Sequence, residues 1–270
     1  MRLRIAQSML RRYEPAAAGV IQVLRLTPRN HEGQYVIGWR IDVSADVRLH
    51  AHEDAFGNLT HVFTAVGPFN ALSVKVDGEV ETQDTNGVVR GAVERFPPNL
   101  FLRDTSPTQA DLRIRDFAAD VRAADRGDVL ACLHALQERL HDAMTHAGDA
   151  SPAAFTAAEA FAQKRGAACD VTHIFIGAAH SLGIPARYVA GYLSAAGSAD
   201  TIVEDGGHAW AEAFVPGLGW VGFDVVNCIC PTDAYVRVAI GLDALGAAPV
   251  RGTRYGASDE TLAVAIKVDQ

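Results

Sequence analysis

Cysteine is scarce in this sequence, and long apolar runs are absent. The 4 cysteines among 270 residues are too few and too unevenly spaced for a disulfide framework, so we expect reduced thiols. No apolar run approaches the ~20 residues that a membrane-spanning helix needs. The segment from Met1 to Gln7 is basic but lacks the apolar stretch of a signal peptide. Together these absences predict a cytoplasmic protein that does not associate with a membrane.

Basic residues are also fewer than acidic residues. The chain has 24 Lys and Arg against 32 Asp and Glu, which gives a formal net charge of -8. A negative chain has no general electrostatic attraction to nucleic acid, so nucleic acid is not an expected partner. Hydrophobic residues at 49% and charged residues at 21% are typical of a globular protein. A chain of this length can bury a sizeable core, and we expect two domains.

The first hundred residues have the composition of β-strands. Five segments are rich in β-branched and aromatic residues: Val20 to Leu26, Tyr35 to Val43, Val47 to His52, Leu59 to Thr64 and Ala71 to Thr82. Turn residues at 56–58 and 77–78 separate some of them. We predict a small antiparallel sandwich or barrel over residues 1–95. The prolines of the segment 96–99 indicate a linker out of this domain.

The remainder of the chain changes from helical to strand-like patterning. Residues 96–155 are predicted to form a helical connection and the start of the core, since apolar residues recur at helical spacing over residues 111–145. A short helix should then run from Thr156 to Lys164, with Gly166 as its left-handed cap. A buried helix over residues 171–182 should end at Gly183. Residues 156–270 then complete an α+β core with strands at 187–193, 208–215, 220–226, 236–240 and 262–268.

Two residues of these strands suggest thiol acyl chemistry. Such chemistry needs a sulfur at a helix N-terminus, an imidazole, and a carboxylate or amide that orients the imidazole. His208 begins one predicted strand, and Asp224 follows it across a connection of Gly and Pro. If the two residues are directly opposite each other, Glu212 opposes Trp220, and residues 213–219 form a wide loop. We therefore predict a wide loop, because a tight turn would misplace the pair.

Several motifs of this chain resemble the bacterial transglutaminase-like superfamily, a branch of the papain-like cysteine enzymes. In the second half they are Gly166 to His173, Leu182 to Tyr192, Gly207 to Glu212 and Gly219 to Asp224. The segments that look like the preceding β domain and the C-terminal segment of bacterial members are Leu24 to Arg29, Asp54 to Asn58, Leu72 to Thr82 and Pro249 to Gly256. The resemblance implies a papain-like core and a hydrolase of the cysteine protease or amidase type. Such an enzyme attacks a peptide or protein substrate through a Cys-His-Asp catalytic triad and needs no cofactor.

The nucleophile position departs from the pattern of this superfamily. Without gaps between Gly166 and His173, the pattern places Ala168 where the cysteine belongs and Cys169 one residue later, about 100° around a helix. Three alternatives follow. Cys169 acts through a local shift, Ala168 replaces a working cysteine by engineering, or the chain is a naturally inactive relative (a pseudoenzyme) that binds peptide-like ligands or a protein partner. The sequence does not decide among these three alternatives. It also does not indicate the oligomeric state. The residues after Asp224, which are usually Pro and Gly, also differ here.

Other residues of these motifs are predicted to support the site. Trp210 and Trp220 should pack beside it, because indole offers a large apolar area and one donor. We interpret His173 as structural and not as the base. Asp170 should cap the helix or meet a basic partner such as Arg187. We expect no metal, because Cys228 and Cys230 lack the second pair of ligands that structural zinc needs.

Overall fold

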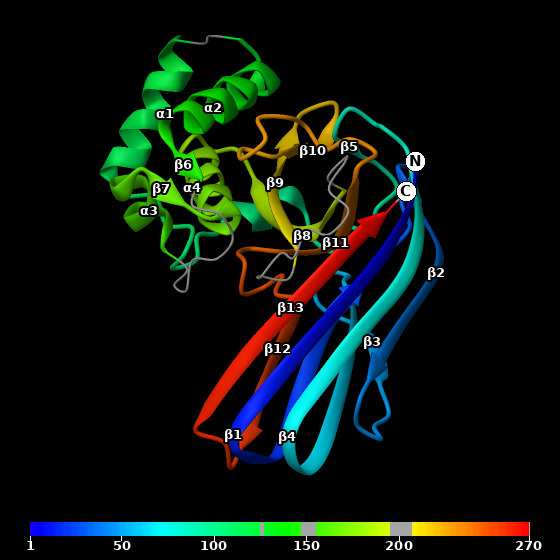
Figure 1. Ribbon diagram of the computed structural model, residues 1–270. Coiled ribbons are helices and arrows are strands. Elements are labelled where there is room, and N and C mark those ends of the chain that lie inside the picture. The colour runs from blue at the N-terminus through cyan, green and yellow to red at the C-terminus, as the bar shows by residue number, and fades with distance from the viewer. Residues whose placement is uncertain (125–126, 147–154, 195–206, 270) are drawn as a thin grey trace.

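The computed structural model describes residues 1–124, 127–146, 155–194 and 207–269. It contains a long twisted antiparallel sheet, a second and shorter antiparallel sheet, and a group of helices beside the second sheet (Figure 1). The predicted α+β class is therefore confirmed. Within the described residues, none of the helices is long and apolar enough to cross a membrane.

The long sheet is built on two strands of unusual length. Strand β1 (Arg2–Thr27) pairs antiparallel with β4 (Leu59–Thr82), and β2 (Gln34–Val43) and β3 (His50–Glu53) pair with β4 on its other edge. Buried and exposed residues alternate along much of β1, as expected for a sheet with one covered face. The predicted strands of this region are present, but β1 begins 18 residues earlier than expected, at 2 instead of 20. Two predicted strands are in fact the single strand β4.

The end of the chain returns to this first sheet. Strands β12 (Val250–Tyr255) and β13 (Asp259–Asp269) both pair with the free edge of β1. The sequence analysis places this last strand with the second half of the chain, and the pairing with β1 shows that this part of the prediction is wrong. The physical reason is that β1 offers a long unpaired edge, and β13 matches it by burying Val264 and Ile266 on the covered face.

The second sheet has five strands in the order β11-β8-β9-β10-β5. These are β5 (Val88–Val89), β8 (Ala186–Leu193), β9 (His208–Val215), β10 (Gly219–Phe223) and β11 (Tyr235–Gly241). Strand β5 lies within residues 1–95, and the 3-10 helix η1 (Pro98–Leu102) follows it in the predicted linker. The two sheets therefore do not follow the expected limits of 1–95 and 156–270.

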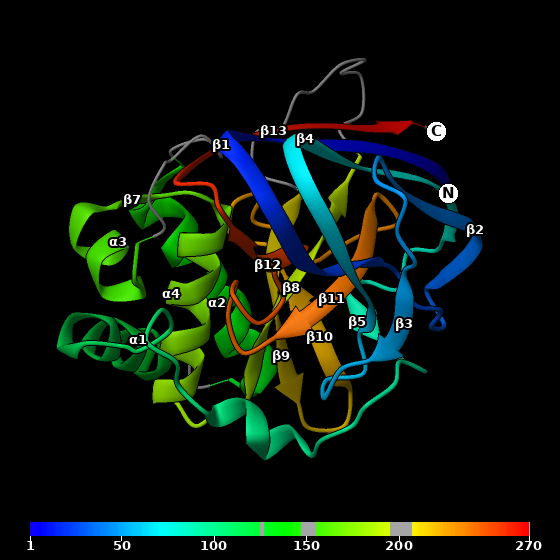
Figure 2. The same cartoon turned by 90° about the horizontal axis from the view of Figure 1, so that it is seen from below.

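Helix α4 (Ala168–Ser181) is the central helix of the second half. It contacts β8 and β9 on one side and α1 (Leu112–Ala124), α2 (Val129–Ala143) and α3 (Ala157–Gln163) on the others (Figure 2). Its buried residues occur on all faces, as predicted for a helix enclosed by protein. It ends before Gly183, whose φ of 73° is the left-handed conformation that favours glycine.

The cap of α3 differs from the prediction. The left-handed residue at its end is Lys164, with a φ of 54°, and not Gly166. Gly166 instead lies in the short strand β7 (Arg165–Gly166), paired with β6 (Thr145–His146). A Cβ atom at Gly166 would lie 2.8 Å from the Cβ atom of Asp170. Glycine at this position therefore allows the chain to pass close to the start of α4.

Candidate active site

His208 and Asp224 meet at the edge of β9 and β10. His208 Nε2 lies 2.6 Å from Asp224 Oδ2. The strand register differs from our prediction, because Glu212 pairs with Gly222, and a tight turn after Val215 replaces the wide loop. The pair forms nevertheless, because Asp224 follows the end of β10 and its side chain reaches His208 diagonally. Diagonal neighbours on one sheet face are within reach of long and aromatic side chains.

Three donors converge on one carboxylate oxygen of Asp224. Oδ2 accepts hydrogen bonds from His208 Nε2, from Asn227 Nδ2 at 2.7 Å and from the Tyr235 hydroxyl at 2.7 Å. Burial acts to raise the pKa of Asp224, but the hydrogen bond and charge of His208, with the bonds from Tyr235 and Asn227, hold this pKa below its usual value. Asp224 is therefore ionised near neutral pH. An ionised carboxylate only accepts hydrogen bonds, so His208 Nε2 carries the proton and Nδ1 is the ring nitrogen able to accept one.

The turn after Asp224 is held from the helix side. Asp224 and Ile229 exchange backbone hydrogen bonds of 2.9 and 3.2 Å, and Gln137 Nε2 donates to both of their carbonyl oxygens at 2.8 Å. Cys228 takes the left-handed conformation within this turn, with a φ of 53°. The residues that depart from the superfamily pattern thus still form a closed turn that fixes the carboxylate.

The His208 ring packs between two aromatic residues. It stacks on Trp210 with ring centroids 6.3 Å apart and is tilted against Tyr235 at 5.9 Å. Its side chain keeps 13% of its surface exposed, whereas that of Asp224 is fully buried. Trp220 packs elsewhere on the sheet, against Phe101, Phe214 and Arg187. Of the two tryptophans, Trp210 is thus the one in contact with the imidazole.

Ala168 and Cys169 are the first two residues of α4. Ala168 is 4% exposed, and Cys169 is half-buried with its Sγ 3.6 Å from Asp170 Oδ1. The N-terminus of a helix presents free N–H groups and the positive end of the helix dipole, which favour thiolates and oxyanions. The start of α4 therefore has the electrostatic character that thiol acyl chemistry needs.

Two regions of this chain match known protein families. Residues 3–81 match the bacterial transglutaminase-like N-terminal region, and residues 115–225 match the transglutaminase-like superfamily. The chain belongs to the transglutaminase-like superfamily. Both matched regions correspond to the parts in which we noted the resemblance, and the second contains Ala168, Cys169, His208 and Asp224.

The similar proteins include relatives from mycobacteria. The uncharacterized protein ML0607 of Mycobacterium leprae is 26% identical over 99% of this chain and 98% of its own length. The uncharacterized protein Rv2569c of Mycobacterium tuberculosis is 24% identical over 90% of this chain and 84% of its own. A crystal structure from Cytophaga hutchinsonii, described as a "putative cysteine protease", covers 100% of this chain and 90% of its own, with a TM-score of 0.79 and 18% identity. This last similarity supports the fold.

Two further residues of the superfamily motifs stabilise the start and side of α4. Asp170 accepts hydrogen bonds from the N–H groups of Ala167 and Phe155, both at 3.0 Å. Of the two predicted roles, a helix cap or a partner of a basic residue, Asp170 therefore has the first. Burial raises the pKa of Asp170. His173 is 1% exposed, its Nε2 accepts from the Ala244 N–H at 3.0 Å, and burial lowers its pKa to about 4. His173 is therefore neutral at pH 7 and holds the segment around residue 244.

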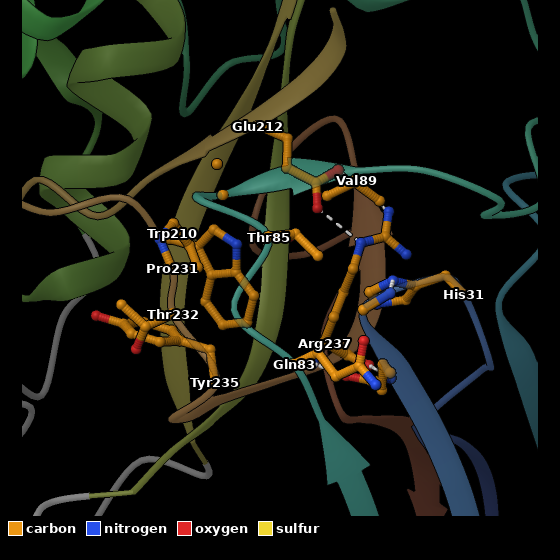
Figure 3. A pocket seen from close by; sticks show the side chains of 14 residues that line it. His31, Gln83, Thr85, Val89, Trp210, Glu212, Pro231, Thr232, Tyr235 and Arg237 are labelled. Carbon is orange, nitrogen blue, oxygen red and sulfur yellow. Dashed lines mark hydrogen bonds and ion pairs between the residues drawn. The ribbon is translucent and has the colours of Figure 1, made fainter. Parts of the chain in front are cut away.

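Arg187 belongs to a buried charge cluster and does not contact Asp170. Arg187 and Glu212 are both 0% exposed and directly paired at 2.7 Å, while Arg237 Nε binds the other oxygen of Glu212 at 2.6 Å and Glu94 binds Arg187 at 2.7 and 2.8 Å. Burial alone would raise the pKa of Glu212, but the two guanidinium groups lower it to about 2. Figure 3 shows Glu212 and Arg237 together at a small cavity between the sheets.

The sequence prediction missed Tyr235, Asn227, Gln137 and this cluster. Glu212 lies four residues after His208 on one strand, so the two side chains are on the same face of the sheet. This spacing could have predicted that Glu212 lies near the site. Tyr235 and Gln137 come from elements distant in sequence. Among the residues that the structure places, no three metal-binding side chains form a group.

Proposed function

We propose that this chain is a transglutaminase-like acyl-transfer scaffold of the cysteine peptidase or amidase type, with Ala168 in the nucleophile position. In this form it binds a peptide or carboxamide group without forming a thioester. The observation that carries the proposal is the His208–Asp224 pair, held at 2.6 Å beside a core helix of the matching superfamily.

The residues present would support each step of the reaction except the attack. In the full reaction a thiolate adds to the carbonyl carbon, the imidazolium protonates the leaving amine, and the resulting thioester is resolved by water or an amine. Asp224 fixes the proton on Nε2 of His208, which leaves Nδ1 to exchange a proton with a thiol. The free N–H groups at the start of α4 would stabilise the oxyanion. The methyl group of Ala168 cannot add to a carbonyl.

The gapless match of residues 166–173 to the superfamily pattern supports Ala168, and not Cys169, as the nucleophile position. Ala168 is the first residue of the helix, and consecutive helical residues point about 100° apart. The sulfur of Cys169 lies against Asp170 Oδ1, an oxygen that accepts the Phe155 N–H. This contact places the sulfur beside the Asp170 carboxylate.

A second candidate is an active enzyme that uses Cys169. The observation in its favour is that Cys169 is half-buried in the first turn of α4, at the positive end of the helix dipole, which favours negatively charged groups. The two candidates differ in which protein forms a reactive thiolate. In the first only the Ala168→Cys variant does so, whereas in the second the unchanged protein already does.

The test is alkylation by iodoacetamide at pH 6, followed by mass spectrometry of the modified peptide. An ordinary thiol with a pKa near 8.5 is almost fully protonated at this pH, so Ala168→Cys should react at least about tenfold faster than any thiol of the unchanged protein. His208→Ala should remove this reactivity. The Ala168→Cys variant should also release product from a mixed peptide substrate, and Ala168→Ser should not.

Two results would contradict the proposal. One is a folded Ala168→Cys variant whose new thiol reacts no faster than Cys132, which is buried on α2. The other is fast alkylation of Cys169 in the unchanged protein that His208→Ala abolishes, which would identify Cys169 as the nucleophile. Cys169→Ser in both backgrounds serves as the matched control.

A further inference from the structure

The hydrogen bonds to Asp224 are divided unequally between its two carboxylate oxygens. Among the described residues, Oδ1 accepts one hydrogen bond, from the backbone N–H of Asn227 at 3.2 Å, whereas Oδ2 accepts three of at most 2.7 Å. A carboxylate has about four lone-pair sites over its two oxygens. Three donors on one oxygen therefore compete for the same charge, and each weakens the pull of that oxygen on the others.

The Tyr235 hydroxyl is well placed to remain a donor at all relevant pH values. Burial raises the pKa of Tyr235, and the nearby charge of Asp224 raises it further. Tyr235 comes from β11, beyond the matched residues 115–225, and its ring also packs on Trp210 with centroids 5.4 Å apart. It therefore combines a permanent hydrogen bond to the carboxylate with a fixed ring position beside the imidazole.

We propose that Tyr235 is a positioning residue that limits how strongly Asp224 holds the protonated His208 ring. By taking part of the charge of Oδ2, its hydroxyl keeps the imidazole able to release a proton as well as to bind one. The hydrogen bond follows from the structure alone, and its consequence for catalysis rests on the proposed function. Asn227 acts on the same oxygen in the same direction.

Other titratable groups near the ring do not replace this effect. Asp224 and Tyr235 are titratable side chains in contact with the His208 ring, and Trp210, which stacks on it, has no titratable group. Asp170, at the start of α4, accepts hydrogen bonds from two backbone N–H groups. Because the Tyr235 hydroxyl bonds to Asp224, removal of this hydroxyl alone, with the aromatic ring kept in place, should reach His208 through Asp224.

The experiment is a titration of the His208 ring by NMR in the full chain, with the signal assigned by its loss in His208→Gln. Tyr235→Phe removes the hydroxyl and keeps the ring. More negative charge is then available to His208, which favours the imidazolium, so the ring pKa should rise by about half a pH unit or more. Asn227→Ala, at an exposed position, should shift it in the same direction.

Tyr192→Phe is the matched control. Tyr192 is buried, and its hydroxyl donates to Gln7 Oε1 at 2.7 Å in the interface between the sheets. This variant loses a comparable hydrogen bond, so it should be destabilised to a similar extent and leave the His208 titration unchanged. An unchanged or lowered His208 pKa in both Tyr235→Phe and Asn227→Ala, with the fold verified by circular dichroism, would overturn the proposal.

The titration does not depend on a nucleophile, so it separates this inference from the proposed function. If Ala168→Cys stays unreactive while Tyr235→Phe shifts the His208 pKa, the positioning role holds and the acyl-transfer proposal fails. If Ala168→Cys is reactive and the titration does not move, the opposite follows. If both proposals hold, adding Tyr235→Phe to Ala168→Cys should move the alkaline limb of the pH profile of thiol reactivity to higher pH. The displacement should equal the rise in the His208 pKa.

Discussion

Two polar clusters share strand β9 and differ in what they leave available. Around Glu212, both carboxylate oxygens are bound by guanidinium groups, and Glu212 and Arg187 are fully buried. Around His208, four residues earlier on the same face, one ring nitrogen is bonded to Asp224 and the side chain is 13% exposed. Burial and charge are strongest in the first cluster, yet its charges are satisfied within the protein. A buried charge cluster is therefore no indication of a site unless one of its atoms remains able to bind a ligand.

The largest expected loss of stability comes from breaking the charge cluster around Glu212. Glu212→Gln keeps the shape of the side chain but leaves Arg187 and Arg237 without their shared charge. Removing one partner of a buried ion pair costs about 3–5 kcal/mol, so the free energy of unfolding in urea should fall by about this amount. Glu94→Gln is the control, since Glu94 also binds Arg187 but its side chain is 34% exposed. Equal and small losses in both variants would show that the cluster does not stabilise the fold.

The second expected effect is a loss of stability at acidic pH, caused by His173, whose buried ring is neutral in the folded protein. Its pKa is about 4 in the folded protein and about 6.5 when unfolded. Above pH 6.5 the ring is neutral in both states. Below it the unfolded state binds the proton first, so stability falls by up to about 3 kcal/mol between pH 6.5 and 4.

Urea unfolding at pH 7, 6, 5 and 4.5 checks this, and His173→Gln should flatten the curve in that window. The lowered pKa of Asp224 and of Glu212 acts in a different window. Their contributions are present above the unfolded values near 4 and are lost as the pH falls further. A profile of His173→Gln that matches the unchanged protein between pH 6.5 and 4.5 would contradict the neutral assignment.

The smallest expected effect on stability comes from the site itself. His208→Ala should lower the free energy of unfolding by about 1–2 kcal/mol, because Asp224 keeps its bonds from Tyr235 and Asn227. The same change should abolish the reactivity of the Ala168→Cys variant. A loss of stability as large as that of Glu212→Gln would show that His208 stabilises the fold as much as the charge cluster does. The two clusters on β9 would then not differ in this respect.

Local sequence patterns predicted the elements of this fold well. The strand His208–Val215 was predicted with its observed bounds, and the buried helix ended at Gly183 as expected, because both signals lie within a few neighbouring residues. The pairing of His208 with Asp224 was also anticipated, but by way of a wrong register. The sequence does not show that a residue beyond the end of β10 reaches diagonally, so direct opposition was the simpler assumption.

The rest of the site depends on distant parts of the chain. Tyr235 and Gln137 lie 11 and 87 residues from Asp224, and neither stands in a motif with it. The left-handed Lys164 was missed because glycine is the more frequent residue at such caps. Gly166 is small for a different reason, the close approach of Asp170.

The pairing of β1 with β13 has a consequence for how the protein is made. Residues 4–14 of β1 have their partners at residues 259–269. At roughly 5–20 residues per second, a ribosome produces that partner on the order of ten to fifty seconds after β1 has been made. During this time one long edge of β1 has unpaired N–H and C=O groups, which are a template for pairing with other chains. Newly synthesised chains should therefore be most prone to aggregate late in translation, and shielding of that edge by a chaperone should raise the yield of folded protein.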